Sequence, residues 1–551
     1  MAGTIIGLTA NPQGQPVLPA SAKTDLSTDL ASDTSTVGQA IAGKFAKKSE
    51  LTDYAKKTDL DGLGGASDAD IAALLQDGSS ASGAALGSAL APLRSDVARV
   101  AASPTMLPLT RALDAGESVG AWFTGDSTGD SGGTTPANDR TAARFARRVA
   151  QAYPSHHVLF KLWDPTTDDY KAWNTVQAHP SGRRFVAFNG VRSLRWVPPV
   201  HSAAQFSTGN IDVRALIHPD NLNPTTPSTI VARMRKGGAT GPWTNDLQFD
   251  FRWFTGGKLS IRHSQDGASF LSDRVSTVTV PFAGAPLWVR ATVEITPGTG
   301  FAAKFYTSPA DDGVIWTQLG TAVSGGGTTT TAMYQSVEGS FFEVGANGWQ
   351  PAAGGFAGKV YEVDLRDGVN GHTIAPSAVE RWERYADTNT TYGGAPTLYF
   401  LNASRSGSDM AYHKDPARLR KETPDYGQTV LVFNDGHNEV GSTGSAWVPP
   451  YEAWVAAVQA RTPDTAVNVI GQNPHTSAWA NEAGYGAEHR KRIMELSAAS
   501  PRKGWGFINV YQAFLDDPRG LGALVSTDGL HPTQTGYEVA GDTVAKAAGV
   551  A

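Results

Sequence analysis

Two separated parts of the chain combine short apolar runs with helical spacing. In the first part, residues 119–124 form an apolar run, and Ala142, Phe145, Val149 and Ala152 follow on one face of a predicted helix. In the second part, three further runs read as buried strands with helical segments between and after them: 397–401, 429–433 and 466–470. Strands that alternate with helices predict an α/β fold with a parallel sheet.

The segment between these parts has a period of two. Alternate residues of 287–295 are apolar and therefore point to one side of a strand, and 301–305 and 361–365 repeat the pattern. Such runs predict an antiparallel β-sandwich or jelly roll of roughly 170 residues. The last run, 358–368, resembles the closing strand of concanavalin-like lectin and laminin-G-type domains, and this resemblance implies a glycan-binding domain.

Residues 1–105 differ from the rest of the chain. They contain no tryptophan and too few large apolar residues to close a core. A nine-residue unit at 45–53 is repeated at 54–62, with a fainter echo at 22–26. A two-heptad seam that could pair between chains follows, at Leu86, Leu90, Leu93, Val97 and Val100. The alternative is a disordered leader with chance periodicity.

Four segments follow from these patterns. We predict an N-terminal segment with short repeats over 1–105 and an inserted lectin-like β-sandwich over 196–370. The remaining segments, 106–195 and 371–551, form one α/β domain whose sequence the sandwich interrupts. A chain of 551 residues is long enough for two or three domains and a tail.

Composition narrows the function classes. Charged residues make up only 18% of the chain, which with 60 Gly and 32 Pro suits turn-rich β structure better than a helical bundle. A net charge of −6 supplies no basic field for phosphates and argues against nucleic-acid binding. The absence of cysteine excludes disulfides and thiolate metal sites. Because no apolar run approaches ~18 residues and no export signal is readable, we expect a soluble protein without membrane insertion.

Small polar residues follow the predicted strands at three places, and a fourth group precedes the last helix. The first three groups contain Ser127, Gly407 and Asn438. Open α/β sheets place their sites beyond the carboxyl ends of strands, so these residues are candidates for one site. In the fourth group, Asp528 lies three residues before His531. An Asp can hold an imidazole in one tautomer while the His removes a proton from a hydroxyl nucleophile.

In this order, Ser, Gly, Gly-x-Asn and Asp-x-x-His resemble the four sequence blocks of the SGNH (GDSL-like) hydrolase family. The resemblance covers 107–195 and 395–551 and implies a three-layer α/β fold with serine esterase activity. It implies Ser127 as the nucleophile and His531 as the general base and then acid. Asp528 is implied to orient His531.

The same resemblance implies an oxyanion hole. Its donors would be the backbone N–H groups of Ser127 and Gly407 and the side-chain amide of Asn438. Convergent neutral donors stabilise the negative charge that builds on one oxygen during ester hydrolysis. The third block has Glu439 where the family often has Asp, which leaves the role of Asn438 intact. The serines that flank Gly407 leave the second-block residue open: Ser404, Ser406 and Ser408.

Two other interpretations fit parts of the sequence. Residues 125–129 also fit the G-x-S-x-G nucleophile elbow of α/β-hydrolases, but an elbow needs a helix directly after the serine, and 129–136 read as a loop. A non-enzymatic receptor-binding adhesin would keep the fold as a scaffold, and the complete set of site residues argues against it. No cofactor and no metal are expected, since none of the twelve His lies in H-E-x-x-H or another metal-ligand spacing.

The repeated units Ala-Lys-Lys-Ser-Glu-Leu and Ala-Lys-Lys-Thr-Asp-Leu resemble those of bacteriophage tail-fibre and minor tail proteins. This resemblance implies that residues 1–105 attach the chain to the tail and trimerise it. It implies a homotrimer on the virion, made in the host cytoplasm and acting at the exterior of the host cell. The expected partners are host surface polysaccharide and other tail proteins. The sequence thus predicts an esterase that removes O-acetyl groups from that polysaccharide, with envelope lipid esters as the alternative substrate.

Overall fold

The computed structural model divides the chain into two compact units, residues 1–96 and 97–551. The structure describes residues 9–10, 16–17, 103–129, 140–191, 193–235, 246–311, 313–346, 354–385, 391–439, 447–476 and 485–550. In the first unit, the described residues form an antiparallel pair of short strands, β1 (Thr9–Ala10) and β2 (Pro16–Val17). The predicted repeats and coiled-coil seam lie outside the described residues.

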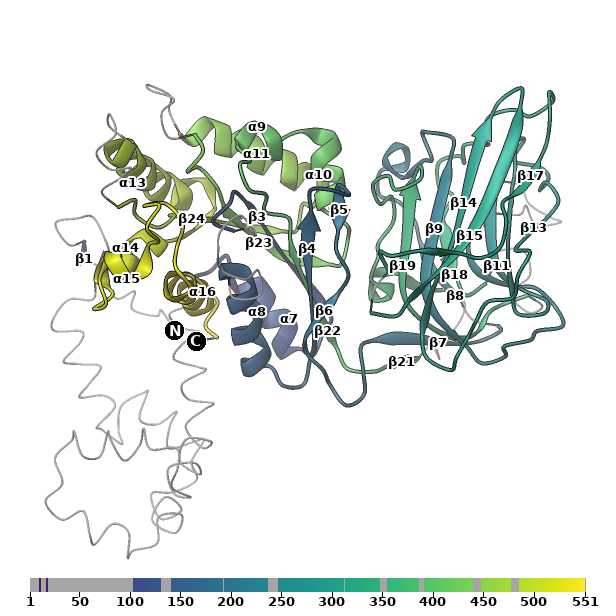
Figure 1. Cartoon of the computed structure of the whole chain (residues 1–551), viewed down its shortest axis with the longest axis horizontal. Coiled ribbons are helices and arrows are strands. Elements are labelled where there is room, and N and C mark those ends of the chain that lie inside the picture. Colours follow the sequence, from purple (N-terminus) through teal and green to yellow (C-terminus); the bar gives the residue numbers. More distant parts are fainter. Residues whose placement is uncertain are drawn as a thin grey trace, which may run out of the picture. The chain divides into compact units, whose positions relative to one another are not determined.

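An eight-stranded sheet forms the centre of the α/β part (Figure 1). Its order is β25-β24-β23-β3-β22-β4-β5, with β6 paired to β4; β5 and β6 run antiparallel to β4, and the other neighbours are parallel. The strands are β3 (Val119–Gly125), β4 (His157–Asp164), β5 (Asp169–Tyr170), β6 (Asn174–Gln177), β22 (Thr397–Asn402), β23 (Gln428–Asn434), β24 (Ala466–Ile470) and β25 (Gly506–Ile508). Because β3 lies between two strands from the other end of the chain, the sheet forms only when both chain parts fold together.

Helices cover both faces of this sheet, which confirms the predicted three-layer fold class (Figure 1). Ala121 and Phe123 of β3 pack into one core, whereas Trp122 packs into the other. The first core is covered by α7 (Leu107–Asp114), α8 (Thr141–Ala152), α14 (Val510–Asp516), α15 (Leu521–Leu524) and α16 (Gln534–Ala547). The second is covered by α9 (Met410–His413), α10 (Pro416–Glu422), α11 (Val448–Arg461) and α13 (Tyr485–Lys503).

The predicted apolar face of the helix over 141–152 is largely confirmed. Ala142, Phe145 and Val149 of α8 are buried in the first core. Ala152 is exposed, so its assignment to that face was wrong. It is the last residue of α8, and at a helix end the helical period no longer fixes which side is covered.

Two antiparallel sheets form the predicted β-sandwich, with strand orders β13-β12-β11-β10-β18-β8-β20 and β16-β15-β14-β9-β19-β7-β21, and β17 paired to β15. Four strands that begin outside 196–370 also pair into these sheets: β7 (Phe185–Asn189), β8 (Ser193–Trp196), β20 (Glu383–Tyr385) and β21 (Thr391–Gly393). The other strands are β9 (Ile211–Pro219), β10 (Ser228–Arg235), β11 (Asp246–Phe254), β12 (Lys258–His263), β13 (Arg274–Val275), β14 (Leu287–Thr296), β15 (Gly300–Pro309), β16 (Thr317–Gln318), β17 (Val323–Gly325), β18 (Phe342–Val344) and β19 (Ala357–Asp367). Two short 3₁₀ turns, η3 (His201–Ala204) and η4 (Val379–Arg381), accompany them.

The period-two pattern of the sandwich strands is confirmed. Val289, Ala291 and Val293 of β14 are fully buried in the core between the two sheets. Phe301 and Phe305 of β15 pack into the same core. The intervening residues of β14 point to the outer face of their own sandwich sheet, which also has eight strands, and therefore away from this core.

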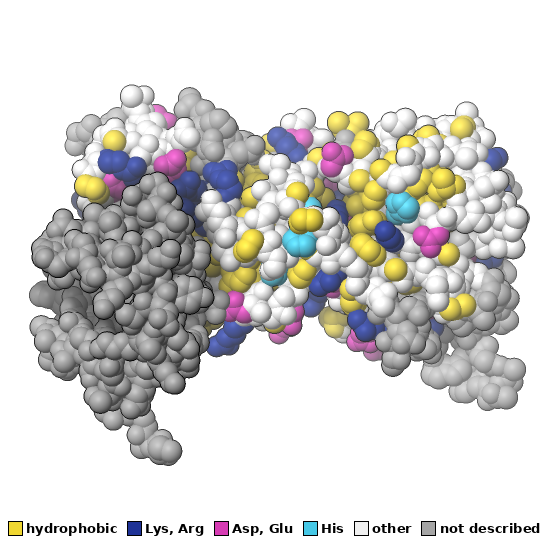
Figure 2. Space-filling view, turned by 90° about the horizontal axis from the view of Figure 1, so that it is seen from below, with side chains coloured by type: hydrophobic (Ala, Val, Ile, Leu, Met, Phe, Trp, Pro, Cys, Tyr) yellow, Lys and Arg dark blue, Asp and Glu magenta, His cyan; other side chains and the backbone are white. Residues whose placement is uncertain are grey.

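The outside of the molecule shows no single-sign field on the face drawn in Figure 2, where hydrophobic, basic and acidic side chains of the described residues are interspersed. This mixture agrees with the modest net charge of −6. A search of the described helices finds none with the length and apolar character required to cross a bilayer.

Candidate active site

Ser127 follows the central strand β3 by two residues. Gly125, the last residue of β3, has a φ of +151°, and a Cβ at this position would lie 1.9 Å from the backbone oxygen of Asn434. The missing side chain therefore permits the close approach of β3 and β23 at their carboxyl ends. The N–H of Asp126 donates to the same oxygen at 3.1 Å. The loop that carries Ser127 is thus fixed beside the loop that follows β23.

The buried carboxylate of Asp126 ties these loops together. Its Oδ1 accepts hydrogen bonds from the N–H and the hydroxyl of Thr128, at 2.9 and 2.8 Å. Its Oδ2 accepts from the N–H of His437 at 3.2 Å and from Nε2 of Gln472 at 2.8 Å. A buried carboxylate requires such donors. Asp126 therefore links the loop after β3 to the loops after β23 and β24, and the sequence reasoning missed this role although Asp126 directly precedes the candidate nucleophile.

Ser127, His531 and Asp528 form one continuous hydrogen-bonded line. The Ser127 Oγ lies 2.8 Å from His531 Nε2, and His531 Nδ1 lies 2.8 Å from Asp528 Oδ2. With Asp528 ionised, Nδ1 donates to it, and Nε2 is left to accept the Ser127 hydroxyl proton. The structure brings together three residues that are separated by up to 404 positions in the sequence.

The loop that carries Asp528 and His531 holds the carboxylate in its charged form. Partial burial of Asp528 opposes this charge. Hydrogen bonds from Ser526 Oγ, from the Leu530 N–H and from His531 outweigh the burial and keep the pKa of Asp528 well below its usual range. The carboxylate is therefore available to hold the proton on His531 Nδ1.

Pro532 does not lie in the first turn of the last helix, although its place in the sequence suggests so. Thr533 caps that helix through its side chain, which accepts a hydrogen bond from the Gly536 N–H. His531 is therefore two residues before the cap, in the loop that precedes α16.

The turn that contains Gly407 is bonded to Gly125, two residues before Ser127, and Asn438 is bonded to that turn. The turn from Arg405 to Ser408 is closed by an N–H to O bond of 3.2 Å, and Gly407 occupies it with a φ of +75°, which favours glycine. Arg405 N–H and Ser408 Oγ both donate to the oxygen of Gly125, two residues before Ser127, at 2.8 and 3.0 Å.

Three candidate oxyanion donors belong to these loops. Asn438 Nδ2 donates to the oxygen of Ser408 at 2.6 Å, which holds the exposed amide of Asn438 against the Gly407 turn. The backbone N–H groups of Ser127 and Gly407 donate to no other residue that the structure describes. Unpaired N–H groups beside a nucleophile are the arrangement that an oxyanion requires.

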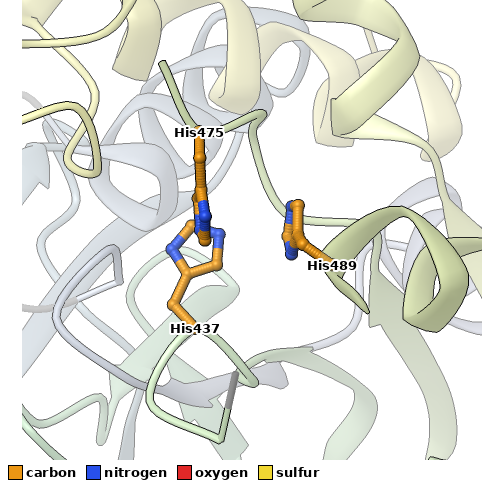
Figure 3. A group of neighbouring side chains, drawn as sticks. All are labelled: His437, His475 and His489. Carbon is orange, nitrogen blue, oxygen red and sulfur yellow. The ribbon is translucent and has the colours of Figure 1, made fainter. Parts of the chain in front are cut away.

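Three histidines form a buried cluster next to these loops (Figure 3). The rings of His475 and His489 stack with centroids 4.5 Å apart, and His437 contacts both at 4.7 and 4.9 Å. His489 Nε2 donates to the oxygen of Asn473, whose Nδ2 donates to the oxygen of Leu530 at 2.8 Å. The cluster therefore supports the loop with Asn438 and the loop with His531. Its members are far apart in the sequence, and no local motif marks them.

The same three residues are the group, among the residues described, that could hold a metal ion. Their nitrogens lie within 4.8 Å of one another, and burial lowers the pKa of all three, so they are neutral imidazoles. His489, however, uses both nitrogens: Nε2 donates to Asn473, and Nδ1 accepts from Arg492 Nη2 at 3.0 Å. A guanidinium this close would repel a divalent cation. The contacts favour a hydrogen-bonded support over a metal centre.

Comparison with protein families agrees with this geometry. The sequence profile of the GDSL-like Lipase/Acylhydrolase family matches residues 352–539, which include Gly407, Asn438, Asp528 and His531. The chain contains a GDSL-like hydrolase domain. The match does not include Ser127, which precedes the sandwich strands in the sequence, and it takes in the sandwich strands β19, β20 and β21. No curated protein matches the chain.

Several solved structures are similar to the chain. A peptidoglycan O-acetylesterase is 14% identical, with 81% of this chain and 94% of that chain covered and a TM-score of 0.30. A lipase/acylhydrolase from Enterococcus faecalis is 20% identical over 27% of this chain and 73% of that chain, with a TM-score of 0.24. A catalytic mutant of an acetylxylan esterase from Geobacillus stearothermophilus is 12% identical over 28% and 73%, also with a TM-score of 0.24. Scores this low carry no argument about the function of the hydrolase domain.

Proposed function

We propose that the chain is an SGNH-type serine esterase of a phage tail, which removes O-acetyl groups from polysaccharide on the host surface. The observation that carries the catalytic part is the line from Ser127 Oγ through His531 to Asp528, with 2.8 Å at each step. The free N–H groups of Ser127 and Gly407 and the amide of Asn438 support an acyl-transfer reaction in particular.

The reaction proceeds in two halves. His531 Nε2 takes the proton of the Ser127 hydroxyl as its oxygen attacks the ester carbonyl, and the three donors stabilise the negative oxygen. His531 then protonates the sugar oxygen, the sugar alcohol leaves, and the acetyl group stays on Ser127. In the second half, His531 removes a proton from water, the hydroxide attacks the acetyl carbon, and acetate leaves as Ser127 recovers its proton. Asp528 holds the imidazole in the required tautomer and stabilises its charged form.

The tail location rests on residues 1–105, whose repeats resemble phage tail proteins and lie outside the described residues. Sedimentation of the full chain against a chain that lacks residues 1–105 tests the attachment proposal. We expect a trimer for the first and a monomer for the second. Monomers in both cases would contradict trimerisation by this segment.

The esterase proposal is tested by acetate release from acetylated xylan and from p-nitrophenyl acetate. The full chain and the control Ser500→Ala, which removes a hydroxyl bonded to Leu496 inside α13, should be active. Ser127→Ala should be slower by about 10⁴-fold or more. Equal rates of acetate release for the wild type and Ser127→Ala would contradict the esterase proposal. If acyl groups were released faster from phospholipid vesicles than acetate from any O-acetylated polysaccharide, the proposed substrate class would be contradicted. The proposed esterase activity would still stand.

A further inference from the structure

The outer face of the eight-stranded sandwich sheet carries charged side chains in register. Arg290 of β14 lies opposite Arg214 of β9, and Arg214 lies opposite Asp364 of β19. Asp212 accepts paired hydrogen bonds from Arg214 and from Arg290, at 2.7 to 3.1 Å, and Asp364 Oδ2 accepts from Arg366 at 2.8 Å. These bidentate contacts hold the charged side chains of the face in fixed positions.

This face meets the edge of the α/β sheet around a cavity of about 200 Å³. Contacts between the two sides border it: Arg366 pairs with Asp169 of β5, and Trp173 Nε1 donates to Glu362 of β19 at 3.1 Å. The volume far exceeds the ~10–15 Å³ that a single water requires. The cavity has room for a small organic ring.

Three buried polar groups of the lining have no partner among the described residues. They are the indole Nε1 of Trp288, Oδ1 of Asp364 and Oγ of Ser377, and the three residues are 3%, 8% and 1% exposed. Leaving a buried donor or acceptor unpaired typically costs ~1–3 kcal/mol, so such groups usually have a partner. A ligand with hydroxyl groups can accept from the indole N–H and donate to the carboxylate. Trp316, which lines the cavity beside Trp288, adds a partly exposed aromatic surface.

Charged side chains of both signs surround the cavity and pair with one another. Four cations line it and face three lining carboxylates and Asp212 behind them: Lys161, Arg214, Arg290 and Arg366 against Asp169, Glu362, Asp364 and Asp212. Arg183, also behind the lining, pairs with Glu362. An anionic or cationic ligand would bury a charge without a counterion, which is costly. A neutral ligand that offers hydroxyl groups and an apolar ring face fits this lining better.

We infer that the cavity binds one neutral sugar unit of the polysaccharide, a hexose or N-acetylhexosamine, and holds the chain for the Ser127 centre. The link to catalysis rests on the proposed function. Thr167 is part of the cavity lining and belongs to the turn after β4. Because β4 runs parallel to β22 and β3, this turn and Ser127 both lie at the carboxyl ends of the parallel strands. Two strand spacings, about 10 Å, separate β4 from β3. A polysaccharide that leaves the cavity beside Thr167 therefore starts from the end of the sheet that carries Ser127.

Calorimetric titration of the full chain carrying Ser127→Ala tests the binding directly. The probes are methyl glycosides of glucose, galactose, N-acetylglucosamine and N-acetylgalactosamine, with methyl glucuronide as the charged comparison. We expect a neutral glycoside to bind and Trp288→Phe, which keeps the ring but removes the N–H, to weaken it about tenfold. Trp253→Phe removes an indole donor that bonds Asn221 elsewhere in the sandwich and should leave the affinity unchanged. No neutral binding, or equal affinity in Trp288→Phe, would overturn the inference.

Kinetics separate this inference from the proposed function. With active protein, Trp288→Phe should raise KM for acetylated polysaccharide about tenfold and leave hydrolysis of p-nitrophenyl acetate unchanged, because that small ester does not need the cavity. An unchanged KM on polymer beside normal p-nitrophenyl acetate hydrolysis would contradict the sugar site alone. A wild type inactive on both substrates would contradict the esterase, and the titration would still decide the cavity.

Discussion

The two folded regions place their polar chemistry in different parts of their strands. In the α/β sheet, β3 and β22 are buried along their whole length, and the site residues follow the carboxyl ends of the strands. In the sandwich, β9, β14 and β19 send one set of side chains into the core and carry charged residues on the opposite face. One region thus has a site at strand ends, and the other has a cavity on a strand face.

Because of this difference, the two sites depend on different structural features. Ser127 and Asn438 are placed by loops that hydrogen bonds fix to neighbouring backbone, so the catalytic centre depends on loop conformation. Arg290, Arg214 and Asp364 come from three strands in register. A slip of one residue would turn these side chains into the core, so the cavity depends on strand pairing. Changes in the two regions should therefore have separable effects on activity and stability.

The largest expected effect is the loss of activity on removing His531. We expect His531→Ala to lower kcat on p-nitrophenyl acetate by about 10⁴-fold or more, because Ser127 loses its base, and to leave the unfolding temperature nearly unchanged. His179→Ala, which changes a histidine outside the site, is the matched control and should retain activity. Comparable kcat values for His531→Ala and His179→Ala would contradict the catalytic role of His531 at the strand ends.

Asp212→Ala should give the opposite result. It leaves Arg214 and Arg290 buried without their shared carboxylate, and breaking such a buried pair costs ~3–5 kcal/mol of unfolding free energy. Denaturant unfolding measures this loss, and kcat on p-nitrophenyl acetate should stay the same under folding conditions. If Asp212→Ala were stable but had a reduced kcat, the charged face of the sandwich and the catalytic centre at the strand ends would not have separable effects.

Asn438→Ala tests a smaller contribution at the strand ends. Loss of one oxyanion donor should lower kcat by about 10²–10³-fold with little change in KM. Because Asn438 is exposed, the unfolding temperature should hardly change. An equal loss of stability and activity would instead assign Asn438 a structural role through its bond to Ser408.

A final effect is a pH dependence of stability that both regions share. Burial, assisted by Arg274 and by Arg492 respectively, lowers the pKa of His263 in the sandwich and of His475 in the histidine cluster to about 4. Their unfolded value is about 6.5, so the unfolded chain binds more protons between these values. The free energy of unfolding should therefore fall as pH drops from about 6.5 to 4, by up to ~1.4 kcal/mol per pH unit for each histidine.

Thermal unfolding of wild type and His263→Gln between pH 7.5 and 5 measures this slope. The variant should lose less stability on acidification than the wild type. Parallel curves for the two proteins would show that His263 is not held neutral by the fold.

The strand-end site could be predicted from the sequence because Ser127, Gly407, Asn438 and His531 each lie in a short motif, in fixed order. Asp126 and the histidine cluster could not, since their partners come from loops that only the folded sheet brings together. The two fold types followed from apolar periodicity, but the position of β3 between β22 and β23 depends on long-range pairing. Trp288 looks like any outward residue of an alternating strand, and only register makes it part of a cavity.

The central claim is that Ser127 is a nucleophile activated by His531. Labelling of the full chain with a fluorophosphonate, followed by peptide mass spectrometry, tests it most directly, because the reagent forms a stable bond with a serine that has an adjacent base. The account predicts one phosphonylated site, Ser127, and loss of that label in His531→Ala. A label on another serine, or equal labelling in the variant, would contradict it.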